Sequence, residues 1–237
     1  MKLKFVALLA LGLPGVAQAQ ANQCVIPRTV PTPHPDLPTA DQPKRVLPIG
    51  SYTLAISWAP QYCRSNAQEA SARFQCGSGN RFGFTLHGLW PDGKGKDWPQ
   101  YCQAAPILPA AEIRKNLCAT PSAQLLQHEY AKHGTCMGVT PAQYFARSTA
   151  LFAKLRSPDM AALSRRRGLT AGQVAAAYAR VNPGLTPAMI RVTAGRGGWL
   201  DELWLCLDTR LAYARCAPNQ DGGLATSAPV KIWRGAR

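Results

Sequence analysis

Three of the four histidines fall in two short segments that could carry acid–base chemistry. His87 lies in FTLHGLWPDG, and His128 and His133 lie in HEYAKHGTC, whereas His34 is expected to be an ordinary exposed residue. Imidazole is the side chain whose ordinary pKa suits proton transfer near neutral pH. The concentration of histidines in two segments therefore indicates a candidate catalytic site.

A helix through HEYAKH would place four polar groups on one stripe. At about 100° per residue, Lys132, Glu129 and His133 lie about 40°, 100° and 140° from His128, whereas Tyr130 falls outside this arc. A solvent-exposed ion pair between Glu129 and Lys132 would explain those two residues without catalysis. It explains the two neighbouring histidines less well.

A zinc site is the metal-dependent alternative for this helix. The zinc motif His-Glu-x-x-His places its histidines at i and i+4, about 40° apart. Here the spacing is i and i+5, about 140° apart, and Glu129 with His133 would be an incomplete ligand set. No C-x-x-C pair occurs in the chain. The sequence therefore predicts no metal site and no cofactor.

The residues after His87 have a composition typical of nucleic-acid binding. Trp90, Asp92 and Trp98 follow within eleven residues, with two lysines among them. Aromatic rings can stack on a base, a carboxylate can accept a hydrogen bond from one, and lysines can contact phosphate. An equally supported alternative is that Trp90 belongs to the hydrophobic core.

The elements that must position these residues alternate irregularly between strand and helix. Hydrophobic patterning and cap residues predict strands at 52–58, 81–87, 189–193 and 200–207, a loop at 91–97, and helices at 122–133, from 140 and from 170 to about 182. This irregular order predicts an α+β fold rather than a doubly wound parallel sheet.

The N-terminal fifty residues are expected to lie outside the compact domain. Residues 1–19 have the charged, apolar and small-residue regions of a signal peptide, with cleavage after Ala19 or alternatively after Ala21. Their apolar run is too short to span a bilayer, which disfavours an uncleaved anchor. Seven prolines then predict an extended arm over 20–49, followed by the domain at 50–237.

The net charge limits the class of partner, and the cysteines limit the cellular compartment. The formal net charge is +15, and without Lys2 and Lys4 it is +13, so we expect an anionic partner such as nucleic acid. Hydrophobic residues make up 46%, which excludes a wholly disordered basic tail. Eight cysteines in an exported chain predict up to four disulfides, although spacing alone leaves 105 possible pairings.

FTLHGLWPDG together with HEYAKHGTC resembles the two active-site segments of the ribonuclease T2 family. The resemblance extends from about Tyr52 to Cys216, and Tyr130 stands where the family more often has Trp. It implies a central antiparallel sheet flanked by helices, stabilised by disulfides. It also implies the pairings Cys63–Cys76, Cys102–Cys136 and Cys206–Cys216, which leave Cys24–Cys118.

The same resemblance implies a metal-independent endoribonuclease that is periplasmic or secreted and acts on RNA as a monomer. A 2′-hydroxyl attacks the adjacent phosphorus, giving a 2′,3′-cyclic phosphate that is then hydrolysed more slowly. By analogy His87 and His133 are the acid–base pair, with His133 favoured as the first base. Glu129 would orient these neighbours, Lys132 would stabilise phosphoryl charge, and His128 would bind phosphate.

Two further hypotheses remain beside the ribonuclease. A non-catalytic anion-binding module would bind nucleic acid in a salt-sensitive way without turnover, but binding alone has no need for the two histidine segments. A metal-dependent phosphodiesterase would lose activity in EDTA. Base preference depends on the shape of the pocket around Trp90, Asp92 and Trp98.

Overall fold

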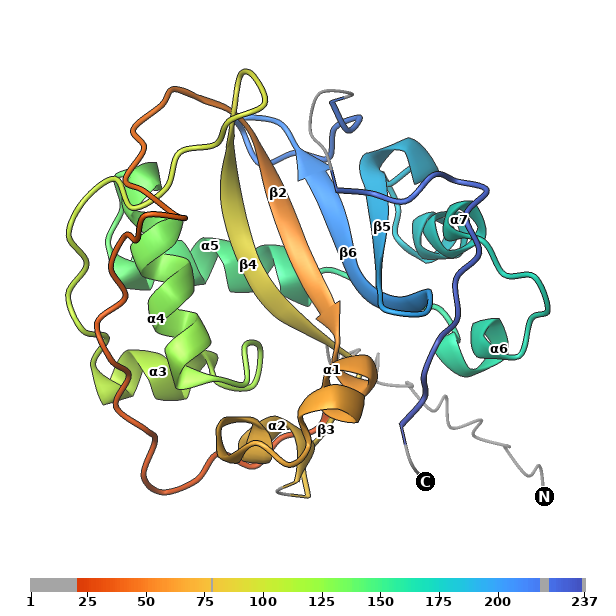
Figure 1. Cartoon of the computed structure of the whole chain (residues 1–237), viewed down its shortest axis with the longest axis horizontal. Coiled ribbons are helices and arrows are strands. Elements are labelled where there is room, and N and C mark those ends of the chain that lie inside the picture. The colour runs from red at the N-terminus through yellow and green to blue at the C-terminus, as the bar shows by residue number, and fades with distance from the viewer. Residues whose placement is uncertain (1–20, 78, 218–221, 236–237) are drawn as a thin grey trace, which may run out of the picture.

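The computed structural model describes residues 21–77, 79–217 and 222–235, so the expected signal peptide at 1–19 lies outside the described residues (Figure 1). A four-stranded sheet has the order β4–β2–β6–β5, and every neighbouring pair is antiparallel. The strands are β2 (Ile49–Trp58), β4 (Phe84–Gly93), β5 (Ile190–Gly195) and β6 (Trp199–Leu207). A small second sheet pairs β1 (Ala21–Gln23) with β3 (Arg81–Phe82). The α+β class with a central antiparallel sheet is confirmed.

Seven α-helices and three 3-10 turns surround the sheet in the described part of the chain. The helices are α1 (Ala59–Asn66), α2 (Arg73–Cys76), α3 (Ala110–Asn116), α4 (Ala123–Lys132), α5 (Pro141–Ala153), α6 (Met160–Ser164) and α7 (Ala171–Val181). The turns are η1 (Ala70–Ala72), η2 (Gly134–Met137) and η3 (Pro187–Met189). The predicted starts of α5 and α7 are confirmed, because Thr140 and Thr170 each form a capping box with the glutamine three residues later.

The sheet has one apolar face and one face that carries polar and aromatic groups. On the apolar face, leucines and other large side chains of β2, β4 and β6 are almost fully buried, among them Leu54, Leu86 and Leu205. Helix α5 passes behind β4 and β2 (Figure 1), and the hydroxyl of its Tyr144 bonds to the backbone of Leu89. The opposite face is therefore left for the candidate site.

Strand β4 runs further than the sequence predicted. We expected residues 91–97 to form a loop, but Pro91 and Asp92 pair with Tyr52 and Ser51 of β2. Proline is compatible with this strand because β4 is at the edge of the sheet, where one side of the backbone needs no partner. As a result, His87 lies in the middle of the strand rather than at its end.

A β-bulge in β4 falls at His87. Leu86 pairs with Ile56 and Gly88 pairs with Ala55, which leaves His87 as the extra residue with no partner on β2. A bulge of this kind changes the direction in which a side chain points. The side chain of His87 is consequently half-buried on the site face, while Leu86 and Leu89 both remain in the core.

The Pro-rich segment runs as an extended chain along the side of the protein that carries α3 and α4, and it has many anchors (Figure 1). Val30 belongs to the hydrophobic core, Arg45 pairs with Gln100 as an isolated β-bridge, and Asp36 contacts the side chains of Tyr101 and His128. His34 is exposed, as expected. This segment therefore contributes contacts to helix α4 and to the site.

All eight cysteines lie in the described residues and form four disulfides. The pairs are Cys24–Cys118, Cys63–Cys76, Cys102–Cys136 and Cys206–Cys216, which confirms the expected pairing. Cys24–Cys118 fixes the start of the Pro-rich segment to the end of α3. Cys102–Cys136 joins the chain after β4 to η2, the turn that follows His133.

Candidate active site

The sheet's polar face brings His87 next to two carboxylates from other elements. Nδ1 of His87 bonds to Oε1 of Glu202 on β6 at 2.6 Å, and Nε2 lies 3.5 Å from Oε1 of Glu129 on α4. Burial lowers the pKa of His87, but the Glu202 hydrogen bond and the charges of Glu129, Glu202 and Asp201 outweigh it and raise the pKa to about 9. His87 is therefore protonated at neutral pH, with Nε2 as the nitrogen that can donate to a ligand.

Glu202 is held as an anion by three donors. Its carboxylate accepts hydrogen bonds from His87, from the hydroxyl of Ser57 at 2.5 Å and from Nε1 of Trp204 at 2.7 Å. Burial alone would raise the pKa of Glu202, but these hydrogen bonds and the charge of His87 lower it to about 2. The ionised form of Glu202 thus orients His87 and favours its protonated form.

Glu129 reaches the sheet through a gap left by a glycine. A Cβ atom on Gly88 would collide with the carboxylate of Glu129 and would lie 2.9 Å from Nε1 of Trp90. That Nε1 donates a hydrogen bond to Oε2 of Glu129 at 2.8 Å, whereas Oε1 is buried without a hydrogen bond. Burial raises the pKa of Glu129 to about 7, against the lowering effects of His87, Trp90 and Lys132.

Trp90 is the ring around which the site is assembled. His133 stacks on it with ring centroids 5.5 Å apart, and His87 and Trp204 meet it edge-on at 5.1 and 5.5 Å. Trp90 is half-buried and lines an open cleft. It therefore has both the packing role and the accessible surface that the sequence left as alternatives.

His133 has the opposite electrostatic environment from His87. It caps the C-terminal end of α4 and is 6% exposed, and its Nδ1 is buried without a hydrogen bond. Burial lowers the pKa of His133 well below its ordinary value, and the positive charges of Lys132, His128 and His87 lower it further. His133 is therefore neutral at neutral pH.

His128 and Lys132 complete the polar stripe of α4. Nδ1 of His128 bonds to a carboxylate oxygen of Asp36, and its ring centroid lies 6.4 Å from that of His133. Burial lowers the pKa of His128, and the charge of Lys132 lowers it further, whereas the charge of Asp36 and its hydrogen bond raise it. Burial also lowers the pKa of Lys132. Tyr130, off the stripe, packs on Tyr144.

A cleft of about 460 Å³ opens beside His133. Its lining residues are Thr53, Trp90, Pro91, Asp92, Gly93, Gly95, Lys96, Asp97, Trp98, Lys132, His133, Arg191, Trp204 and Gly222. The carboxylate of Asp92 accepts a hydrogen bond from Thr53, and Trp98 is 44% exposed with Arg45 over its ring. The cleft thus joins all three predicted base-binding residues to His133, while His87, Glu129 and His128 do not line it.

Three contributors to the site were not predicted from the sequence: Glu202, Trp204 and Asp36. A signal existed for Glu202, because a carboxylate stands inside the otherwise apolar strand WLDELWLCL. An ionisable residue that alternates with buried leucines is costly unless it has a partner. Asp36 had no such signal, since nothing in the Pro-rich segment indicates which helix it crosses.

The described residues hold neither a cluster of metal-ligating side chains nor a helix that could span a membrane. No group of three or more His, Cys, Asp or Glu side chains that could hold a metal ion occurs among residues 21–77, 79–217 and 222–235. Within the same part of the chain, no helix has both the length and the apolar character that a membrane span requires.

The sequence is similar to one known family and to individual proteins. The model of the Ribonuclease T2 family matches residues 49–216. A probable ribonuclease of Haemophilus influenzae is 30% identical over 180 residues, which cover 71% of this chain and 61% of that protein. A ribonuclease of Aeromonas hydrophila is 34% identical over 115 residues, covering 48% and 50%. The chain thus spans between half and about three fifths of the length of these curated relatives.

Solved structures share the fold. Trichomaglin, described as an S-like ribonuclease, superposes with a TM-score of 0.60 and 21% identity over 78% of this chain and 98% of its own. RNase NT in complex with 5′-AMP superposes with a TM-score of 0.53 and 22% identity over the same shares, 78% and 98%. At these identities the similarity shows the architecture.

Proposed function

The chain belongs to the ribonuclease T2 family, and on that premise we propose that it is an exported endoribonuclease that cleaves single-stranded RNA without a metal ion. One observation carries the proposal. His87 and His133 contact the same ring, that of Trp90, and are held in opposite protonation states at neutral pH. A general acid and a general base are thus present together before substrate binds.

In the first step, neutral His133 accepts the proton of a ribose 2′-hydroxyl, and the 2′-oxygen attacks the adjacent phosphorus. The bond between phosphorus and the 5′-oxygen of the next nucleotide breaks. Protonated His87 gives its Nε2 proton to that leaving oxygen. The products are a 2′,3′-cyclic phosphate and a 5′-hydroxyl. DNA has no 2′-hydroxyl and should not be cleaved.

In the second step the two histidines exchange roles. His87, now neutral, accepts a proton from water, and the water oxygen attacks the phosphorus of the cyclic ester. The bond from phosphorus to the 2′-oxygen breaks, and His133, now protonated, returns a proton to that oxygen. The product is a 3′-phosphate. Each histidine ends the cycle in the state in which it began.

Charge that develops on the phosphoryl oxygens needs a positive partner. Lys132 lines the cleft beside His133 and can stabilise this charge. Nε2 of His128 can contact the phosphate, and a bound phosphate would favour the protonated form of that ring, against the burial that lowers its pKa. Glu129 lies within ion-pair distance of His87 and orients it.

The cleft is the proposed place for the base of the nucleotide that loses its 2′-proton. It offers the rings of Trp90, Trp98 and Trp204 for stacking and the carboxylate of Asp92 for a hydrogen bond to a base. The structure of RNase NT was solved with 5′-AMP, which supports nucleotide binding by this fold.

Export, domain organisation and oligomeric state are part of the proposal. The signal-like residues 1–19 and four disulfides support a periplasmic or secreted protein. We propose a catalytic domain from residue 50, against which the extended segment up to residue 49 packs, and a monomeric enzyme with no membrane attachment after signal removal. The mature charge of +13 would concentrate RNA around the site.

The test is incubation of purified protein with RNA in EDTA, with cyclic phosphate ends as the readout. The wild type should produce them, and the His87→Ala and His133→Ala variants should lose at least about 100-fold in rate. His34→Ala, which removes an exposed histidine, is the matched control and should be fully active. Near wild-type cleavage by either active-site variant would overturn the mechanism. Binding without turnover by the wild type would indicate the anion-binding alternative.

A further inference from the structure

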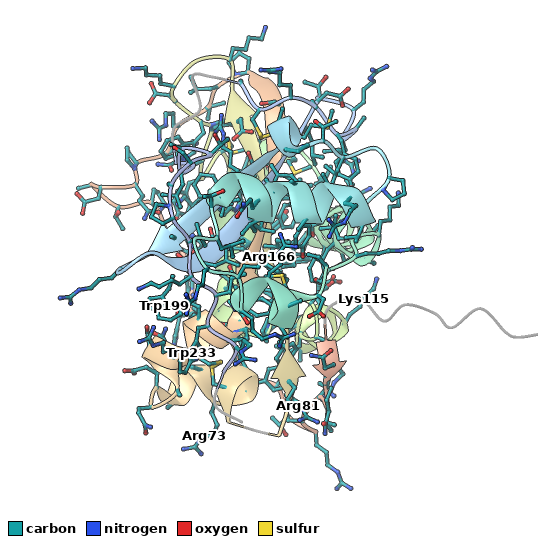
Figure 2. All side chains as sticks on the ribbon, turned by 90° about the vertical axis from the view of Figure 1, so that its right-hand side faces the viewer. Arg73, Arg81, Lys115, Arg166, Trp199 and Trp233 are labelled. Atoms are coloured by element: carbon teal, nitrogen blue, oxygen red, sulfur yellow. A yellow bond between two sulfur atoms is a disulfide. The ribbon has the colours of Figure 1, made fainter. Side chains whose placement is uncertain are left out.

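A second hollow, of about 470 Å³, lies where α1 meets the start of β6. It is lined by Gln61, Tyr62, Arg64, Ser65, Asn66, Gly195, Arg196, Trp199 and Asp201. None of these residues lines the cleft beside His133, and the proposed reaction uses none of them. Trp199 and Trp233, which border this region, lie next to each other in Figure 2.

Arg64 lies in the corner between these two indole rings, which are nearly perpendicular to each other, at 88°, with centroids 5.9 Å apart. Its guanidinium carbon lies 4.4 Å from the ring centroid of Trp199 and 4.8 Å from that of Trp233. The ammonium of Lys231 lies 4.6 Å from the ring of Trp199. Cation–π contacts with two rings restrict the position of a guanidinium.

The aromatic walls are themselves fixed by the fold. Nε1 of Trp58, at the end of β2, donates a hydrogen bond to the carbonyl of Trp233 at 2.5 Å. Trp199 belongs to β6 and forms a parallel bridge with Lys231. Arg64 is therefore held in place before any ligand arrives, which lowers the entropy cost of binding.

The hydrogen-bonding edge of Arg64 is available. The side chain is exposed, and among the residues that the structure describes its guanidinium has no hydrogen bond or ion pair. The two rings contact the guanidinium from adjacent sides, so N–H groups on its remaining sides can reach a ligand. A planar fork of N–H donors matches the oxygens of a phosphate, and Arg196 adds a second positive charge to the same hollow.

The hollow adjoins the His87 side of the candidate active site. Asp201, in its lining, precedes Glu202, the partner of His87, and its charge acts on His87. The cleft with Asp92 and Trp98 instead adjoins His133. In the proposed reaction, His133 acts on the nucleotide that carries the 2′-hydroxyl, and His87 acts on the 5′-oxygen of the nucleotide that follows. RNA on the 3′ side of the cut therefore leaves toward the hollow.

We propose that this hollow binds the phosphodiester backbone of single-stranded RNA on the 3′ side of the cleaved bond, with Arg64 as the main contact. The inference rests on the proposed function for the direction of the strand. Asp201 repels phosphate at the end nearest His87, so the contacted phosphate lies at the Arg64 and Arg196 end. A dinucleoside monophosphate has only the phosphate that is cleaved, so it cannot make this contact.

The test uses oligodeoxynucleotides that contain one ribonucleotide, so that only one bond can be cut. Extending the 3′ side from one to four nucleotides should raise kcat/KM of the wild type. In Arg64→Ala this rise should be roughly threefold to tenfold smaller. Cleavage of the shortest substrate, and the effect of 5′ extension, should be unchanged. Arg166→Ala, which removes an exposed arginine after α6, is the matched control. An equal loss for short and long substrates, or an equal loss in Arg166→Ala, would overturn the proposal.

A binding measurement separates this site from the proposed activity. Fluorescence anisotropy of an all-deoxy oligonucleotide, which cannot be cut, gives affinity whether or not the protein is an enzyme. Arg64→Ala should weaken binding and reduce the slope of log K against log salt by about 1, whereas Arg166→Ala should not. Absence of RNA cleavage by the wild type would defeat the proposed function alone. Equal affinity of the wild type and Arg64→Ala would defeat the hollow as an RNA site.

Discussion

Nδ1 of His87 lies 2.6 Å from Oε1 of Glu202, a carboxylate that reaches it from β6, on the far side of β2. This hydrogen bond leaves Nε2 of His87 directed at Glu129 and favours the charged form of the ring. The residue that sets the protonation state of His87 therefore lies 115 positions away in the sequence.

Replacing Glu202 by Gln should move the alkaline limit of activity to lower pH. The general acid must be protonated, and loss of the carboxylate lowers the pKa of His87 from about 9 toward its ordinary value. We expect the alkaline limb of the kcat/KM profile to shift down by about one to two pH units. Glu69→Gln, at an exposed carboxylate, should leave the profile unchanged. An alkaline limb at the same pH in the Glu202→Gln variant and in the wild type would contradict the role of Glu202 in raising the pKa of His87.

Replacing Asp36 by Asn should weaken substrate binding more than it slows the chemical step. Asp36 fixes the ring of His128 and favours its protonated form, which is the form that can bind phosphate through Nε2. We expect KM to rise roughly threefold to tenfold with a smaller change in kcat. Asp41→Asn, at an exposed position of the same Pro-rich segment, is the control. A fall in kcat with unchanged KM would place Asp36 in the chemical step instead.

A methyl group at Gly88 should separate α4 from β4. The added Cβ would overlap the carboxylate of Glu129 and press on the indole of Trp90. Gly88→Ala should lose about 1–3 kcal/mol of stability, measured by urea unfolding, and at least about tenfold in activity. Gly77→Ala, where the nearest atom would lie at an ordinary 3.6 Å, should change neither. Wild-type activity in Gly88→Ala would show that the close approach of Glu129 is unnecessary.

Removing the Cys102–Cys136 disulfide should impair activity beyond its effect on stability. The backbone N–H of Cys136 donates to the carbonyl of His133, and that of Tyr101 donates to the carbonyl of Lys132. The double Cys→Ala variant should lose about 2–4 kcal/mol of stability and also lose kcat well below its melting temperature. The double variant of Cys206 and Cys216 removes another disulfide and should lose stability alone. Unchanged kcat in the Cys102–Cys136 variant would show that the disulfide does not position His133.

Local patterns predicted the site where its residues are close in sequence. The helical arc of HEYAKH placed Glu129 and His133 on one stripe, and both contact Trp90 in the structure. The cap residues Thr140 and Thr170 marked the starts of α5 and α7. These features depend on interactions within one turn of helix. Such interactions can be read from spacing alone.

Contacts made by strand pairing and by the Pro-rich segment could not be predicted from the sequence. Glu202 meets His87 only because β6 pairs with β2, and Asp36 meets His128 only because the segment crosses α4. The end of β4 was predicted wrongly because Pro91 favours a loop, whereas its edge position allows a strand. In each case the deciding interaction joins residues that are distant in the chain.

The bulge at His87 fixes how many residues this stretch of β4 can contain. Leu86 and Leu89 both belong to the core, and between them stand His87, which carries the imidazole, and Gly88, which leaves room for the carboxylate of Glu129. A deletion would remove either the ring or that space, and an insertion would turn the following leucine away from the core. Natural variation in length should therefore be absent here and should appear instead in the turn around Gly95.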